Sequence, residues 1–124
     1  RLMTLAQVEN ISGVAGAYSA RVRLRPRYVN ENCTACGACA DAVTSEVDNP
    51  FDYGMSRIKA AYLPHNMAYP QRYLLDPSII GSSEAQSAKD ACRYNAIDLN
   101  MIEKLIEFDI GAVIFATGWQ PYAA

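Results

Sequence analysis

The stretch ENCTACGACADAVTSEV, residues 31–47, decides how the rest of the chain is interpreted. Cys33, Cys36 and Cys39 follow one another at a strict spacing of three, so one short loop carries three thiols. Thiolates that gather in this way are the usual ligands of zinc ions and of iron–sulfur clusters. The position of the fourth ligand is therefore the first question that the sequence raises.

The missing ligand is explained by comparison with the bacterial ferredoxin run C-x2-C-x2-C-x3-C-P, whose fourth cysteine ligates the cluster held by a second such run. Here Val43 stands at the fourth position of the first run. Counting back from Cys92 at the same spacing gives Ala88, Ala85 and Ser82, so the second run keeps only its fourth ligand. The four ligands that are missing would all belong to one cluster, and the four that remain would all belong to the other. The sequence therefore predicts one complete 4Fe–4S site, ligated by Cys33, Cys36, Cys39 and Cys92.

Three other uses of the four cysteines stay open. A structural zinc ion also accepts four thiolates, although such sites more often come from two separated C-x2-C pairs. A 3Fe–4S cluster could be held by the first three cysteines alone. A disulfide framework belongs to oxidising compartments and usually has its cysteines spread along the chain. The cluster is favoured because one loop supplies three ligands, and it indicates a reducing, cytoplasmic setting.

Composition sets outer limits on the function. The chain has 124 residues, of which 51% are hydrophobic and 19% charged, which is typical of one folded domain. A net charge of −2 gives no reason to expect nucleic acid or a membrane surface as a partner. No run approaches the roughly 20 apolar residues that span a bilayer. The first residues have no signal-peptide pattern and do not begin with Met, so we expect the interior of a longer protein.

The stretch YSARVRLR, residues 18–25, alternates apolar and polar residues and predicts a half-buried strand. Gly13 and Gly16 precede it and favour a turn. The polar face forms a basic stripe that is either a solvated strand face or a contact for an anionic cofactor or partner. Its members are Arg21, Arg23, Arg25 and Arg27.

The other segments give weaker signals. Residues 48–81 lack a long period and are expected to be largely irregular, with His65 at the surface. Ser82 or Ser83 is a candidate N-cap for a helix, and Asn95 favours a turn after it. Trp119 and the tyrosines are interpreted as packing residues. The remaining expected elements are helices at 39–46 and 82–92, and strands at 26–29, 58–63, 96–100 and 112–115.

Four segments together resemble the flavoprotein A chain of heterodisulfide reductase and its relatives, which include the heterodisulfide-reductase-like complexes of sulfur oxidisers. The segments are RPRYVNENCTACGACADA, IKAAYLPHNMAYPQRYLLDPSII, ACRYNAIDL and DIGAVIFATGWQPYAA. The resemblance implies a cytoplasmic FAD protein with a thioredoxin-reductase-like flavin fold and an inserted ferredoxin domain. It also implies partners, namely the remaining part of the flavoprotein and the other subunits of a redox complex.

On this resemblance we expect an α+β fold in three parts. Residues 26–107 would form a ferredoxin-like, single-cluster insert, and residues 1–25 and 108–124 would be strands of the FAD domain on either side. Thr117 and Gly118 are similar to the sharp strand end that approaches the flavin in such proteins. No G-x-G-x-x-G phosphate loop is present, so the main FAD-binding motif is expected outside this chain.

The expected function is electron transfer. One 4Fe–4S cluster would relay single electrons between the FAD of the parent protein and partner subunits in sulfur metabolism, and the chain alone would catalyse nothing. One alternative is a structural or interaction insert pinned by a redox-inert cluster or by zinc. A catalytic domain is a second alternative, which the sequence disfavours because no cysteine is left over as a nucleophile.

Overall fold

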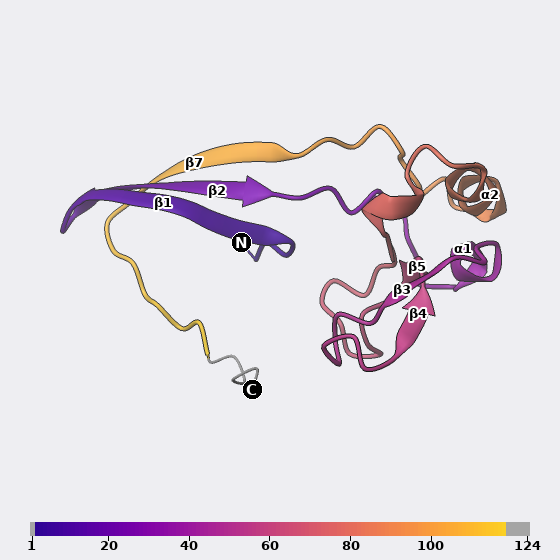
Figure 1. Cartoon of the computed structure of the whole chain (residues 1–124). Coiled ribbons are helices and arrows are strands. Elements are labelled where there is room, and N and C mark those ends of the chain that lie inside the picture. The colour runs from indigo at the N-terminus through magenta and orange to yellow at the C-terminus, as the bar shows by residue number, and fades with distance from the viewer. Residues whose placement is uncertain (1, 119–124) are drawn as a thin grey trace.

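The computed structural model describes residues 2–118 and contains two parts joined by two stretches of chain (Figure 1). One part is a three-stranded antiparallel sheet. Its strands are β1 (Ala6–Val14), β2 (Ala17–Leu24) and β7 (Lys104–Ile110), in the order β1-β2-β7. The chain leaves this sheet after β2 and returns to it at β7, so the second part lies between two neighbouring strands (Figure 1).

Strand β2 confirms the period-two prediction. Ala20 and Val22 are buried, and Arg21 on the other face is exposed. Arg21 lies directly opposite Glu107 of β7, and the two side chains form an ion pair at 2.8 Å. The middle strand is therefore held on its polar face by a cross-strand pair as well as by the backbone ladder.

The predicted turn at Gly13 and Gly16 is also confirmed, since β1 and β2 form a hairpin. Gly13 has a φ of +110°, and a Cβ added there would lie 2.2 Å from the carbonyl oxygen of Ala17. Only glycine fits this position, because both the backbone conformation and the space exclude a side chain.

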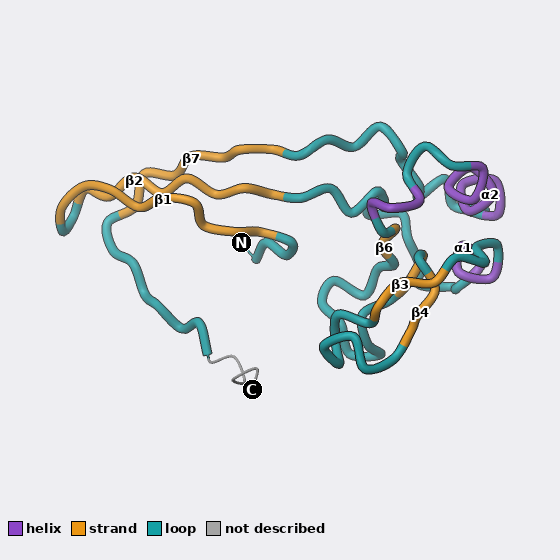
Figure 2. The backbone as a smooth tube through the Cα atoms, viewed as in Figure 1, coloured by secondary structure: helices purple, strands orange, loops and turns teal. Residues whose placement is uncertain are grey.

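The second part holds both helices and four short strands (Figure 2). Strand β3 (Glu46–Asp48) pairs with β4 (Arg57–Lys59), and β5 (Ala61–Tyr62) pairs with β6 (Leu74–Leu75). A 3-10 helix, η1, covers Pro77–Ile79. Helices α1 (Ala38–Asp41) and α2 (Ser83–Ala91) pack against each other. The core contains Val29, Cys39, Val43, Ala60, Ala61, Leu75, Ile79, Ala85, Ala88, Ala96 and Ile97.

Helix α2 confirms the prediction at 82–92 almost residue for residue. The Oγ of Ser82 caps it by accepting a hydrogen bond from the backbone N–H of Ala85 at 3.4 Å. Helix α1 is shorter than the predicted 39–46. Its early end depends on Glu84 of α2, because the N–H groups of Thr44 and Ser45 donate to the carboxylate of Glu84 instead of to helical carbonyls.

Two predicted strands, 26–29 and 96–100, are wrong as strands. A single bridge, between Val29 and Ile97, joins these segments, and the N–H of Asn30 donates to the carbonyl oxygen of Ala96 at 2.7 Å. Tyr28 has a φ of 59°, which interrupts the extended conformation. The two segments thus lie side by side without forming a regular ladder.

The predicted strand at 58–63 is divided at Ala60. This residue is fully buried and changes partner, since its N–H donates to Ser45 and its carbonyl accepts from Asp76. Most of residues 48–81 is irregular, as predicted.

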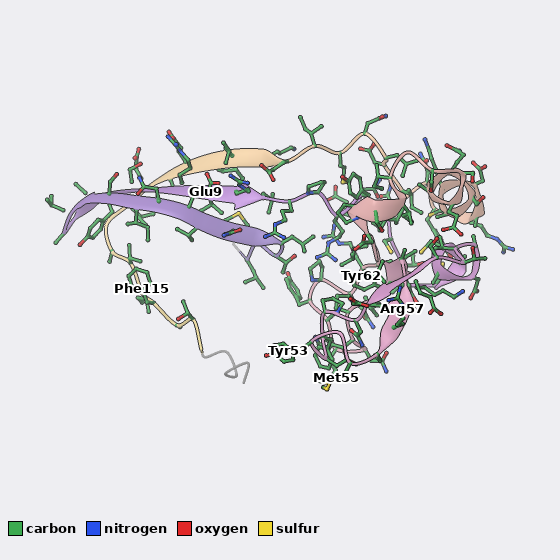
Figure 3. The ribbon with its side chains drawn as sticks, in the orientation of Figure 1. Glu9, Tyr53, Met55, Arg57, Tyr62 and Phe115 are labelled. Atoms are coloured by element: carbon green, nitrogen blue, oxygen red, sulfur yellow. The ribbon has the colours of Figure 1, made fainter. Side chains whose placement is uncertain are left out.

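The buried strand predicted at Ala112–Phe115 is wrong. Ile114 and Phe115 are 91% and 76% exposed, and Phe115 lies on the loop that follows β7 (Figure 3). The cause lies in the register. Strand β7 ends with Ile110 opposite Tyr18, next to the hairpin turn, so β2 has no residues left to pair with 112–115. The interpretations of Trp119 and of residues 119–124 fall outside the described residues, as does residue 1.

The predicted division into three parts stays a prediction. Its boundary between residues 107 and 108 falls inside β7, which begins at Lys104. No helix among residues 2–118 is long and apolar enough to cross a membrane.

Candidate metal centre

The four cysteines line one small cavity. Cys33 and Cys36 come from the loop before α1, Cys39 from α1 itself, and Cys92 from the residue directly after α2. None of the four takes part in a disulfide. The packing of α1 on α2 and the bridge between Val29 and Ile97 bring the two distant segments together. The structure therefore gathers the four predicted ligands in one place.

The ligand loop turns sharply twice. Ala35 has a φ of 56° and Gly37 a φ of 88°, both in the left-handed region. A Cβ added to Gly37 would lie 3.4 Å from the hydroxyl oxygen of Tyr73, which also lines the cavity. These two turns curl the backbone around the cavity, and the absence of a side chain at Gly37 leaves room for Tyr73.

Backbone N–H groups point at two of the sulfurs. The N–H of Ala35 donates to the Sγ of Cys33 at 3.4 Å, and the N–H of Ala96 donates to the Sγ of Cys92 at 3.4 Å. Such bonds orient a thiolate and stabilise negative charge on its sulfur. One of them comes from each of the two segments that supply the ligands.

Burial disfavours the thiolate form of Cys39. Burial, followed by the charge of Cys33, raises the pKa of Cys39 to about 11. Burial, followed by the charge of Cys39, raises the pKa of Tyr73. Because a thiol must lose its proton to bind a metal, ligation at Cys39 requires positive charge inside the cavity.

The donor set suits more than one metal group. Four cysteines line the cavity, and within residues 2–118 no group of three or more His, Cys, Asp or Glu side chains is placed to hold a metal ion. Zinc would bring every sulfur to about 2.3 Å from one point. A cubane cluster would instead spread its four thiolates over separate irons. Four thiolates are a donor set that either group accepts.

The four positions where the ligands of a second cluster would lie hold other structures. Val43, Ala85 and Ala88 are each 0% exposed and belong to the same core. Ser82, at the remaining position, caps α2. These positions are close together, as the two-run comparison predicts, and side chains and a regular helix occupy them.

The other residues singled out in the sequence lie away from the cysteines. Thr117 and Gly118 are exposed on the segment after β7 and do not line the cavity. His65 is exposed, as predicted, and its Nδ1 accepts a hydrogen bond from the N–H of Met67 at 3.2 Å. Tyr73 and Tyr94 also line the cavity, although no sequence pattern points to them. Neither has a spacing that would distinguish it from the other tyrosines.

Comparison with curated proteins finds the same kind of relative repeatedly, the A chain of a heterodisulfide reductase. That of the ferredoxin:CoB-CoM heterodisulfide reductase of Methanosarcina acetivorans is 36% identical over 124 residues, covering 98% of this chain and 16% of the relative. The iron-sulfur A chain of the CoB–CoM heterodisulfide reductase of Methanocaldococcus jannaschii is 36% identical over 99% of this chain and 19% of the relative. The A chain of the H2:CoB-CoM heterodisulfide, ferredoxin reductase of Methanothermobacter thermautotrophicus is 31% identical over 98% of this chain and 18% of the relative.

No family model matches the chain. The chain spans 16–19% of the length of these three relatives.

Proposed function

We propose that this chain, which belongs to the family of heterodisulfide reductase A chains, is an electron-transfer module carrying one 4Fe–4S cluster. One observation carries the proposal. Cysteines from two distant segments surround a single cavity, whereas packed side chains fill the positions of a second ligand set. Cys33, Cys36, Cys39 and Cys92 would each hold one iron.

The protein's contribution is to hold the thiolates and control their surroundings. A bound cluster supplies one-electron chemistry at the reduction potential that its environment sets. The N–H groups of Ala35 and Ala96 donate toward the sulfurs, and the buried side chains of Val29 and Ile97 keep water from one wall of the cavity. Such bonds to sulfur and the exclusion of water are what tune a cluster.

The wider role in the parent protein is part of the same proposal. The second part of the chain would be a ferredoxin-like insert in an FAD domain, with electrons passing between the FAD and partner subunits in sulfur metabolism. This part lies between β2 and β7, which are neighbours in the sheet, and that arrangement supports its interpretation as an insert. Thr117 and Gly118 would approach the flavin.

Anaerobic reconstitution tests the cluster. Iron and sulfide are counted, and the EPR spectrum of the dithionite-reduced chain is recorded. We expect about four irons and four sulfides per chain and a cubane signal. Cys92→Ser should abolish or alter that signal, whereas Ala91→Ser, which adds a hydroxyl one residue away, should leave it unchanged. An EPR signal that Cys92→Ser leaves unchanged would refute Cys92 as the fourth ligand.

The alternative is a structural insert, and the same preparation discriminates it. Zinc without sulfide, or a cluster that is inert between about −700 and +450 mV, would replace the electron-transfer proposal by a structural one.

A further inference from the structure

The basic stripe of β2 divides into two halves with different surroundings. Arg21 pairs with Glu107 at 2.8 Å. Arg23 pairs with Glu9 and, at 3.6 Å, with Glu103. Carboxylates on and beside the neighbouring strands thus neutralise the first half of the stripe, which is a solvated strand face.

The second half of the stripe faces a different place. Arg25 and Arg27 line an open cavity of about 560 Å³ at the junction between the sheet and the second part of the chain. Arg72 and Lys104 line the same cavity, and Asp98 is the one acidic residue in its wall among the described residues. The volume is within the roughly 300–1,000 Å³ usual for small-molecule sites. In a chain of net charge −2, this concentration of positive charge is a local feature.

Arg27 and Arg72 both line this cavity. Among residues 2–118, neither takes part in an ion pair. Burial, followed by the charge of Arg72, lowers the pKa of Arg27. Arg27 donates to the carbonyl oxygen of Arg72 at 3.2 Å and to the Oγ1 of Thr4 at 2.9 Å, which fixes its guanidinium group in the wall. Two partly buried like charges in the wall of one cavity are stabilised when an anion enters that cavity.

We propose that this cavity binds the phosphate group of a phosphorylated organic ligand of nucleotide type. Guanidinium groups match phosphate oxygens with paired hydrogen bonds, and Lys104 adds a further positive charge. The apolar part of the wall, which includes Leu5, Leu24 and Met101, would contact the organic body of the ligand. The proposal goes beyond electron transfer and does not depend on which metal the cysteines hold.

The site would lie directly beside the metal centre. Val29 lines both the basic cavity and the cysteine cavity, so the two share one residue of their walls. The charge of Cys33 partly offsets the lowering of the pKa of Arg27, which agrees with this proximity.

Calorimetric titration of the full chain tests the proposal, with ADP, pyrophosphate and adenosine as probes at low ionic strength. We expect ADP to bind with a Kd below about 1 mM, pyrophosphate to bind more weakly and compete with it, and adenosine not to bind. Arg72→Gln should weaken ADP binding by about tenfold or more. This variant keeps the hydrogen bond from Arg27, because Arg27 donates to the backbone carbonyl of Arg72.

A matched variant separates the charge of this cavity from the net charge of the chain. Arg21→Gln removes an equal charge that Glu107 already neutralises. It should bind ADP within about twofold of the parent chain. Loss of binding in Arg21→Gln as large as in Arg72→Gln would overturn the proposal, and so would the absence of ADP binding. Equal affinities for ADP and pyrophosphate would refute the contact with an organic body.

Discussion

Val43 offers a direct test of whether packed side chains have replaced a second cluster. It is 0% exposed and lies in the core just after α1, with Ala85 and Ala88 of α2 in the same cluster of side chains. Val43→Ala removes two buried methyl groups, each contributing about 0.8 kcal/mol. The cavity left behind adds to this loss, so we expect the free energy of unfolding to fall by about 2–3 kcal/mol.

The matched control is Val14→Ala. Val14 ends β1 and is 69% exposed, so the same change of side chain should cost about 0.5 kcal/mol or less. Urea unfolding is followed anaerobically by circular dichroism, with all variants at the same cluster loading so that the contribution of the cluster cancels. With ordinary slopes of about 1–3 kcal/mol per M, Val43→Ala should lower the midpoint by about 0.7–3 M.

Equal midpoints for the two variants would refute the reasoning. Val43 would then not be part of a packed core, and the position of the lost fourth cysteine would have to be regarded as open space. A loss confined to Val43→Ala would show that stability now depends on the place where a second cluster would have been ligated.

Two further predictions concern a carboxylate and a turn. The carboxylate of Glu84 accepts hydrogen bonds from Ser45 and Thr44, which lower its pKa to about 2, so its contribution to stability is complete above about pH 4.5 and is lost as the pH falls toward 2. The difference in thermal midpoint between the parent chain and Glu84→Gln should therefore shrink between pH 6 and pH 3, and a constant difference would contradict this origin. Gly16→Ala should destabilise the chain by about 1 kcal/mol through backbone strain alone, because open space surrounds Gly16. Gly13→Ala should cost clearly more, since the new Cβ would meet a backbone oxygen, and equal urea midpoints for the two variants would contradict the contact.

The parts of the structure that can be predicted from sequence depend on local patterns. Strand β2 follows from period two, and α2 from its Ser82 cap and its helix-forming residues. The gathering of Cys92 with the first three cysteines also follows from spacing, because the two-run comparison carries information about contacts between distant segments.

The predictions that failed concern segments whose structure depends on partners distant in the sequence. Nothing in residues 112–115 shows that β2 is already paired as far as its turn, so an apolar run there has the pattern of a buried strand. The early end of α1 depends on Glu84, which lies many residues later. Arg72 joins Arg27 only because the folded chain brings the irregular segment back beside the end of β2.

The register of the sheet has a consequence for how such a chain can evolve. Leu24, the last residue of β2, pairs with Lys104, the first residue of β7, so the points where the chain leaves and re-enters the sheet are adjacent. Joining these two points by a short turn would preserve every pair of the ladder between them, because closing a short loop costs little entropy. Residues 25–103 could thus be gained, exchanged or lost as a cassette without changing the strand order of their host. Strands β2 and β7 are paired up to the points where the chain leaves and re-enters the sheet. A displacement of the sheet would therefore reach the cysteine cavity along both connections at once.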